Sequence, residues 1–465
     1  MALRLPAVGI DDMALYAPKL YLDIKALAEK RQISYEKLRD GLGLHKMAIP
    51  DLHEDAATMA AEAIFELINR NQLDPRKIGR IWLGTESALD MAKPTATYAV
   101  GMVQDRLKAQ YGVDCFRHCD MLDMTFACIG ATDALLGTID WVQQQKDRIG
   151  IVVASDIAKY ELESTGEYTQ GAGAIAILIR HNPRILKIRP LIGVASESVH
   201  DFFKPRRERF SETPIFDGQY SNQCYQNRMM EALAHFRALA VESGLFKGDQ
   251  YKAMSERWAR MIFHLPYSFH AKRMYVEQFI QERKEKGVFT SDLNKLKLQV
   301  PSRDAFEEEK VFLKAQAAFN KAVSESSLYQ QFVSEKLEKA QRASSEMGNL
   351  YTASIFLALM STLESDFAEG VELKGKRIGF VAYGSGSKAK VFEAVVGAEW
   401  KSAVSHFHVF QKLSARRSIS YDCYEALHKG CKMESHSPEV GRWKLDRVGV
   451  EGVTLGARYY SEFPS

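Results

Sequence analysis

The sequence has few cysteines, almost no excess charge and no long hydrophobic run, and each absence excludes a class of protein. Six cysteines in 465 residues are too few for the disulfide framework of a small secreted protein. A net charge of +3, from 62 basic and 59 acidic residues, predicts no nucleic-acid partner. No run of about 18 apolar residues occurs, so no membrane span is expected, and no signal-peptide pattern is present. We therefore expect a cytoplasmic protein.

Cysteine spacing gives little support for a bound metal. Cys115 and Cys119 form a CxxxC pattern with His118 between them, but no second ligand pair follows at the spacing of a zinc site. No nucleotide-binding fingerprint occurs either. We therefore predict no metal and no redox cofactor.

The first part of the chain alternates strand-like and helix-like segments. Hydrophobic residues at helical spacing predict helices at 54–71, 94–112 and 131–145. Continuous apolar runs predict strands at 7–18, 78–87, 148–158 and 171–180. This alternation favours an α/β layered fold with a mainly parallel sheet, and it defines a first half at residues 1–182.

A similar series recurs in residues 183–465, which predicts an internal duplication. Strands are expected at 185–198, at 260–266 and on both sides of a Gly-Ser turn in 377–396, with helices at 222–245 and 346–365. A Lys- and Glu-rich stretch at about 275–345 is expected to form a solvated helical hairpin on the surface. The tail at 395–465 ends in one or two strands of a small sheet.

The stretch DMTFACIGAT places Cys128 where a strand meets a buried helix. Free N–H groups and the dipole at a helix N-terminus stabilise a thiolate and lower the pKa of a cysteine there. The same N–H groups can stabilise an oxyanion, and Ala127, Gly130 and Ala131 are small enough to leave room for an acyl group. Cys128 is therefore a candidate nucleophile, although a buried, inert cysteine is the alternative.

Three further features lie at the ends of predicted strands in the two halves. Glu86 lies at the strand end within IWLGTES, and His264 lies at the strand end within IFHLPY. The segment YGSGSK supplies a turn whose N–H groups could face a ligand oxygen. Polar groups at the carboxyl ends of strands are where α/β folds hold their chemistry. Taken singly, Glu86 could cap a helix and His264 could be a core histidine; together with Cys128 they indicate an active site.

These motifs resemble the 3-hydroxy-3-methylglutaryl-coenzyme A synthase family of the thiolase superfamily, especially its bacterial form. The resembling segments occur in the family's order along essentially the whole chain: GTES, TFACIGATDAL, VASDIAKYELESTGEYTQGAGAIAIL, HDFFKP, FDGQYSNQCY, FHLPYS, GNLYTAS and YGSGS. The resemblance implies a duplicated, five-layer αβαβα thiolase-like fold, a homodimer and CoA thioesters as substrates.

The resemblance also implies roles for individual residues. Cys128 would accept an acetyl group from acetyl-CoA, Glu86 would remove a methyl proton to make the enolate, and His264 would polarise or protonate the ketone of acetoacetyl-CoA. Hydrolysis of the Cys128 thioester would release 3-hydroxy-3-methylglutaryl-CoA for the mevalonate route to isoprenoids. The implied substrate-binding residues are Tyr160, Thr169, Phe203, Lys204, Ser221, Pro266, Lys272, Arg273, Asn349, Tyr351, Gly384 and Ser385.

One departure from the family leaves the acceptor open. Phe269 stands where the family usually has a lysine that meets the CoA phosphates, and Lys272 and Arg273 are candidate replacements. The alternative is a polyketide β-branching enzyme that acts on a β-ketoacyl group of an acyl carrier protein. The basic segment with Lys204, Arg206, Arg207 and Arg209 could bind either an acidic carrier or CoA phosphates. An inactive scaffold is a third hypothesis, which the presence of all three candidate catalytic residues disfavours.

Overall fold

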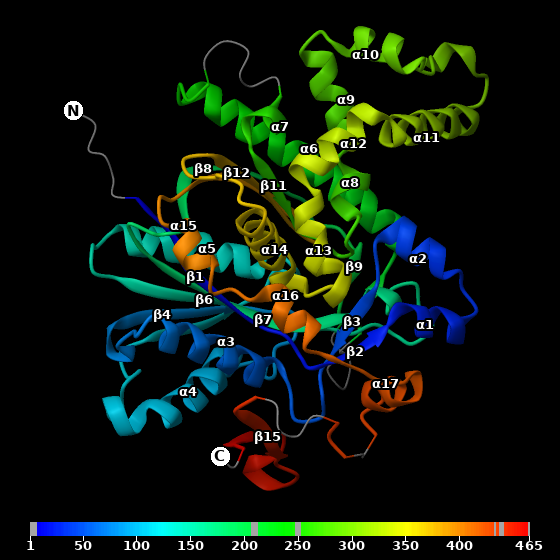
Figure 1. The fold of residues 1–465 in the computed structure, drawn as a ribbon. Coiled ribbons are helices and arrows are strands. Elements are labelled where there is room, and N and C mark those ends of the chain that lie inside the picture. The colour runs from blue at the N-terminus through cyan, green and yellow to red at the C-terminus, as the bar shows by residue number, and fades with distance from the viewer. Residues whose placement is uncertain (1–6, 206–212, 247–252, 432–433, 437–440, 464–465) are drawn as a thin grey trace.

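A computed structural model describes residues 7–205, 213–246, 253–431, 434–436 and 441–463. At its centre is a nine-stranded sheet with the order β11-β12-β13-β8-β1-β7-β6-β4-β5 (Figure 1). Its strands are β1 (Val8–Tyr16), β4 (Ile78–Gly84), β5 (Asp120–Met124), β6 (Ile149–Ala158), β7 (Gly171–His181), β8 (Leu186–Ser196), β11 (Arg260–Phe263), β12 (Arg377–Gly384) and β13 (Lys388–Val396). β1 and β8 pair at only two positions, so this junction separates an N-terminal sheet half from a C-terminal one.

The prediction of a mainly parallel sheet is wrong. Within the described residues, three strand pairings of this sheet are parallel, β4 with β5, β4 with β6 and β11 with β12. The other five are antiparallel. The reason is visible in the connections: β6 to β7 and β12 to β13 are joined by loops without the crossover helix that a parallel pair needs.

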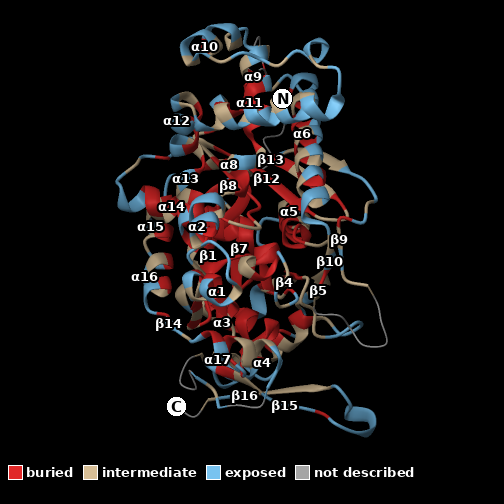
Figure 2. Cartoon of the chain, turned by 90° about the vertical axis from the view of Figure 1, so that its right-hand side faces the viewer, coloured by how far each residue is buried: buried red, intermediate tan, exposed pale blue. Residues whose placement is uncertain are grey.

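Both faces of the N-terminal sheet half are buried by helices. Alternate residues of β6 point to opposite faces, so Val152 and Ala154 pack in one core cluster while Ile151 and Val153 pack in another. The first cluster contains α5 (Gly130–Gln143) and α14 (Ser354–Ala368), and the second contains α3 (Ala56–Arg70) and α4 (Thr95–Tyr111). With α6 (Gly218–Glu242) on β8 and β13, the layers run helix, sheet, helix, sheet, helix (Figures 1 and 2).

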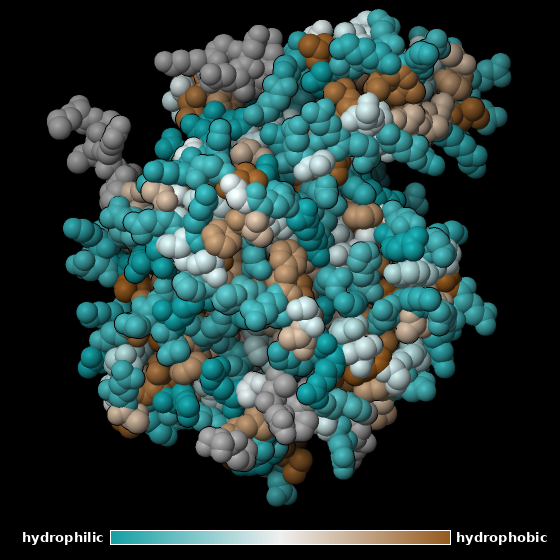
Figure 3. Space-filling model, in the orientation of Figure 1, coloured by the Kyte–Doolittle hydropathy of each residue, from teal (hydrophilic) through white to brown (hydrophobic). Residues whose placement is uncertain are grey.

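The Lys- and Glu-rich stretch forms five helices rather than a single hairpin: α9 (Val276–Glu285), α10 (Phe289–Leu296), α11 (Glu309–Glu325), α12 (Ser327–Lys336) and α13 (Glu338–Met347). Helices α10 and α11 stand out from the body, whereas α13 buries Ala340, Ala343 and Met347 against α14 (Figures 1 and 2). Hydrophobic side chains gather on the protruding part formed by α10 and α11 (Figure 3), where Val311 and Leu313 are exposed.

Shorter elements surround these layers. The helices are α1 (Ile24–Arg31), α2 (Tyr35–Leu42), α7 (Met254–Arg257), α8 (His270–Met274), α15 (Trp400–Val404), α16 (Val409–Ser414) and α17 (Tyr421–His428). Strands β2 (Leu20–Asp23), β3 (Lys46–Ile49) and β14 (Arg417–Ser418) form one small sheet, and β9 (Phe202–Phe203) pairs with β10 (Ile215–Phe216). The predicted terminal strands are β15 (Trp443–Val448) and β16 (Arg458–Glu462), an antiparallel pair. Among the described helices, none combines the length and the apolar character needed to cross a membrane.

Candidate active site

Small residues surround Cys128 because backbone segments approach each other closely there. A Cβ on Gly130 would lie 2.5 Å from the carbonyl oxygen of Met124, and one on Gly84 would lie 2.2 Å from the backbone nitrogen of Ala131. These glycines therefore let the start of α5 pack against the ends of β5 and β4. The prediction that the small residues leave room for an acyl group is wrong for Gly130 and Ala131, whose surroundings are already filled.

The thiol of Cys128 donates a hydrogen bond to the carboxylate of Glu86, with 3.0 Å between Sγ and Oε1. Burial and the Glu86 charge raise the pKa of the thiol well above its ordinary value. The expected lowering of this pKa is therefore wrong, because burial and the negative charge of Glu86 outweigh the effect of the helix N-terminus. Burial also raises the pKa of Glu86 to about 7. Near neutral pH the thiol therefore keeps its proton, while the Glu86 carboxyl gains or loses one.

A buried carboxylate, Asp156 on β6, fixes the loop that carries Glu86. One of its oxygens accepts hydrogen bonds from the backbone N–H of Glu86 (2.7 Å) and from the hydroxyls of Thr85 (2.9 Å) and Ser87 (3.1 Å). The other accepts from the N–H (3.0 Å) and hydroxyl (2.5 Å) of Thr352, just before α14. Asp156 thus ties the general-base candidate to the second half. Sequence analysis did not select it, although a lone carboxylate inside an apolar strand was a usable signal.

His264 follows β11 and lines the same cavity as Cys128. Its backbone N–H donates to the carbonyl of Val381 (3.1 Å), and its carbonyl accepts from the hydroxyl of Tyr225 (3.0 Å). Burial lowers the pKa of the imidazole to about 3, so the ring is neutral at pH 7. Within the described chain, Nδ1 has no hydrogen-bond partner. A neutral imidazole in this place can polarise a carbonyl by donating a hydrogen bond.

The front cavity, about 480 Å³ in volume, contains both the Cys128 thiol and His264. Loops from both halves of the fold form its wall, at the carboxyl ends of strands such as β6, β11 and β12. This is the place where open α/β sheets bind ligands. Seven predicted substrate-binding residues line it: Tyr160, Thr169, Ser221, Pro266, Arg273, Asn349 and Ser385.

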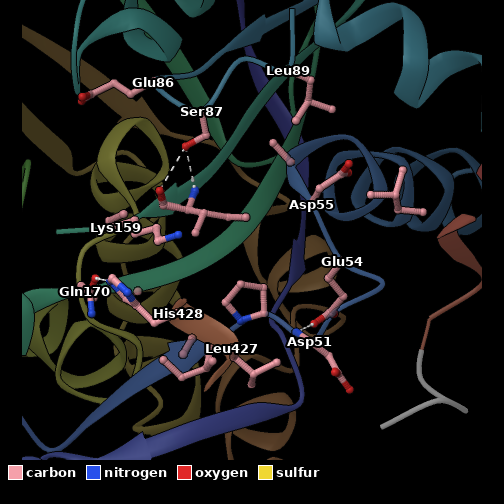
Figure 4. Close-up of a pocket in the computed structure, with 18 of the residues that line it drawn as sticks. Asp51, Glu54, Asp55, Glu86, Ser87, Leu89, Lys159, Gln170, Leu427 and His428 are labelled. Atoms are coloured by element: carbon pink, nitrogen blue, oxygen red, sulfur yellow. Dashed lines mark hydrogen bonds between the residues drawn. The ribbon is translucent and has the colours of Figure 1, made fainter. Parts of the chain in front are cut away.

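Glu86 and Lys204 line a different opening, the rear cavity, which is also about 480 Å³. Figure 4 shows this cavity with Glu86 at its edge. The Lys204 ammonium donates to the backbone carbonyl of Glu86 (3.0 Å) and lies 4.8 Å from the centre of the Tyr351 ring. Tyr351 is fully buried in one apolar cluster with Cys128. Tyr351 therefore supports the site from behind the front cavity.

Three other predicted residues lie apart from the described lining of both cavities: Phe203, Lys272 and Gly384. Phe203 is exposed on β9. The Lys272 ammonium lies 3.2 Å from the centre of the Phe269 ring, and that ring packs on Gly43 at the end of α2. Arg273 is thus the candidate CoA-phosphate cation that lines the front cavity. Arg206, Arg207 and Arg209 lie outside the residues that the structure describes.

The Gly-Ser turn after β12 is held by a second buried carboxylate, Asp201. Asp201 accepts hydrogen bonds from the N–H of Gly386 (2.8 Å) and from the hydroxyls of Ser221 and Tyr383 (both 3.1 Å). The Ser387 N–H donates to the carbonyl of Glu197. These two N–H groups of the turn are thereby occupied. Asp201 stands within HDFFKP, a segment that sequence analysis singled out without selecting this residue.

Comparisons with known proteins identify the family of the chain. Two family descriptions match consecutive parts of the chain: "Hydroxymethylglutaryl-coenzyme A synthase N terminal" at residues 4–183 and "Hydroxymethylglutaryl-coenzyme A synthase C terminal" at residues 188–439. The hydroxymethylglutaryl-CoA synthase of Haloferax volcanii is 32% identical over 453 residues, which cover 97% of each chain.

Solved structures share the whole fold. The structure of MvaS in complex with 3-hydroxy-3-methylglutaryl coenzyme A has a TM-score of 0.80 and 28% identity, covering 98% of this chain and 99% of that one. The HMG synthase of the curacin biosynthetic pathway, in complex with acetyl donor-ACP, has a TM-score of 0.75 at 20% identity over 98% and 100% of the chains, which shows the fold alone. The predicted family, enzyme class and thiolase-like fold are confirmed, and the chain belongs to the hydroxymethylglutaryl-CoA synthase family.

Proposed function

We propose that the chain condenses acetyl-CoA with free acetoacetyl-CoA through an acetyl group carried on Cys128. The observation that supports this most is the 3.0 Å contact between the Cys128 thiol and Glu86, next to a cavity that His264 also lines. In this proposal Cys128 is the nucleophile, Glu86 the base and His264 the carbonyl-polarising group that a Claisen-type condensation requires.

Acetyl transfer begins when the Cys128 thiol gives its proton to Glu86. The thiolate attacks the carbonyl of acetyl-CoA, the carbon–sulfur bond to CoA breaks, and the protonated Glu86 returns the proton to the leaving CoA thiolate. A carboxyl pKa of about 7 suits both directions, because such a group accepts and donates protons with little driving force near neutral pH.

Condensation then uses the same carboxylate a second time. Glu86 removes a proton from the acetyl methyl group, and the resulting carbanion attacks the ketone of acetoacetyl-CoA. His264 donates a hydrogen bond to the ketone oxygen as negative charge develops there. The proton that Glu86 took from the methyl group is then returned to this oxygen, which gives the 3-hydroxyl group and an ionised Glu86. Because the pKa of His264 is about 3, we assign it polarisation of the carbonyl rather than proton delivery from an imidazolium.

A substitution of Arg273 tests whether the acceptor is carried by free CoA or by a carrier protein. Arg273 lines the front cavity and is exposed, whereas the neighbouring Lys272 is held over Phe269. If Arg273 binds the CoA phosphates, Arg273→Ala should lose roughly 1.5 kcal/mol, the lower end for a charge-assisted contact. The KM for acetoacetyl-CoA should therefore rise about tenfold with kcat little changed. Steady-state kinetics with Lys272→Ala as the matched control measures this.

A pantetheine thioester that lacks the nucleotide phosphates supplies the second control. Parent and Arg273→Ala should use it equally well, since it has no phosphate for Arg273 to bind. The carrier-protein alternative predicts instead that the parent turns over a carrier-bound β-ketoacyl group and hardly any free acetoacetyl-CoA. That result would overturn the proposed acceptor and leave the chemistry of Cys128 unchanged.

We further propose that the enzyme is a homodimer formed along β5. This strand ends the described sheet and pairs with β4 alone, so its outer edge offers hydrogen-bonding groups to a second copy. Leu122 on β5 is 38% exposed. Leu122→Glu would place a charge at the centre of this edge and should shift the protein from dimer to monomer in sedimentation equilibrium. Leu313→Glu, on the protruding helix α11, is the control. A monomeric parent would contradict the proposal.

Two organisational predictions stay proposals as well. We divide the chain into thiolase-like halves at residues 1–182 and 183–465, the first carrying Glu86 and Cys128 and the second carrying His264. We also retain the cytoplasmic location and the place in isoprenoid synthesis that the family resemblance implies.

A further inference from the structure

The Cys128–Glu86 pair stands between two cavities. Cys128 lines the front cavity, and Glu86 lines the rear cavity, although the two side chains are hydrogen-bonded to each other at 3.0 Å. Figure 4 shows the Glu86 carboxylate turned away from the middle of the rear cavity, while Ser87 and Lys159 face it. Glu86 therefore belongs both to the lining of the rear cavity and to the contact with the nucleophile.

The last step of the proposed reaction needs water at a place that the substrate blocks. After condensation, the new acyl group is bonded to Cys128 at one end and to CoA at the other. It must therefore occupy the front cavity until the bond to Cys128 is hydrolysed. Water that approached through the front cavity would have to pass the acyl chain and the pantetheine arm.

Resting on the proposed function, we infer that the rear cavity supplies the water that hydrolyses the acyl–Cys128 thioester. Glu86 takes a proton from this water, and the hydroxide oxygen bonds to the thioester carbonyl. The carbon–sulfur bond to Cys128 then breaks, and Glu86 returns the proton to the departing thiolate. The products are the free carboxylic acid end of the acyl-CoA and the Cys128 thiol, so no other reactant is needed.

The lining of the rear cavity is mainly apolar but includes charged side chains that can hold water. Charged side chains enter its wall from four separate segments: Asp51, Asp55, Lys159 and Arg458. An alkyl group placed among them would have to displace their hydration, which is unfavourable. The volume of about 480 Å³ exceeds by far the roughly 30 Å³ that one water molecule takes in the liquid. Leu52 and Met91, which are 37% and 58% exposed, open the cavity to solvent.

Lys204 links the lining of the rear cavity to Glu86. Lys204 lines the rear cavity, and its ammonium donates a hydrogen bond to the Glu86 carbonyl. The charge of this ammonium lowers the pKa of Glu86, although burial raises that pKa by more. The same ammonium would stabilise the oxyanion that forms when water attacks the thioester. A lysine is well suited to this place because its four-carbon stem allows the head group to shift as water passes.

The test fills the rear cavity from two opposite walls. Ala88→Leu adds bulk to the loop after β4, and Leu427→Trp adds bulk from α17. Leu313→Trp on the protruding helix α11 is the matched control. Enzyme quenched during turnover with acetyl-CoA and acetoacetyl-CoA is examined by intact-protein mass spectrometry. Both filled variants should accumulate the condensed acyl-CoA adduct on Cys128, with kcat lowered at least about tenfold, while the control behaves as the parent.

Two further measurements separate this inference from the proposed function. Acetylation by acetyl-CoA alone, and loss of that acetyl group to water, should be unchanged in the filled variants, since the front cavity is then open. Normal release of the condensed product by either filled variant, after it has been acetylated, would overturn the inference. Equal slowing of the hydrolysis of the acetyl group and of the condensed acyl group would overturn it as well, because the substitution would then act on Glu86 itself. A parent enzyme that is never acetylated would instead refute the proposed function.

Discussion

Cys128→Ser is expected to fold normally and to form no acetyl-enzyme. The parent thiol reaches its reactive form by passing a proton over 3.0 Å to Glu86, whose pKa of about 7 makes it a weak base. A serine hydroxyl holds its proton far more tightly than a thiol, so the same carboxylate cannot generate the nucleophile. Turnover should fall by about 10⁴-fold or more, as when a catalytic nucleophile is removed from other enzymes. Mass spectrometry after addition of acetyl-CoA measures the intermediate directly.

Cys423→Ser is the control for this experiment. Cys423 is a second free thiol that is partly accessible, and it lies on α17, away from the front cavity. This variant should gain the acetyl group as the parent does. A stable acetyl group on the peptide that contains residue 128 of Cys128→Ser would show that the nucleophile lies elsewhere.

The strand and helix pattern of the chain was readable from sequence, whereas the direction of the strands was not inferred correctly. Apolar runs located β6 and β7 because strands that are almost entirely buried need no polar face. A similar run located β4, although that strand is only partly buried. The mainly parallel prediction gave too little weight to the loop at 159–170, which has no crossover helix and so returns the chain antiparallel. The narrow β1–β8 junction has no local signal, since two paired residues on each strand create it.

The chemistry of the site depends on contacts between residues that are distant in sequence, which explains the error about the thiol. The local motif around Cys128 predicts a helix N-terminus and hence a lowered pKa. In the structure, burial and Glu86 raise this pKa instead of lowering it. Glu86 lies 42 positions away from Cys128 in the sequence. The rear cavity was equally invisible in the sequence, because α17 and the β15–β16 hairpin bring Leu427 and Arg458 to a loop of the first half.

Glu86→Gln should separate acetylation from condensation. The carboxylate raises the pKa of the Cys128 thiol by its charge and by the hydrogen bond it accepts. A neutral amide removes the charge, whereas burial, the largest cause of the raised pKa, remains. The thiol proton can pass to solvent in place of Glu86, so the acetyl-enzyme should still appear. Condensation should fall by at least about 10²-fold, because the methyl proton has no base to receive it.

The pH dependence gives this variant a second signature. In the parent, Glu86 acts as a base only when ionised, and burial raises its pKa to about 7. The kcat for condensation should therefore rise with pH through this region and level off above it, while below about pH 6 most of the enzyme has a protonated Glu86. Glu86→Gln should lose this titration. Glu282→Gln, which alters another buried glutamate of raised pKa hydrogen-bonded to Ser255 and Tyr275, should retain it.

The two readouts together test the assignment of roles between Glu86 and Cys128. Rapid-quench mass spectrometry reports acetylation of Glu86→Gln, and product analysis with acetoacetyl-CoA reports condensation in the same sample. If the variant lost acetylation but condensed acetyl groups supplied on the enzyme, Glu86 would serve the thiol and another base would make the enolate. The expected result is acetylation that is slower but retained, with condensation lost. Solvent can take the thiol proton in place of Glu86, whereas removal of the methyl proton needs a positioned base.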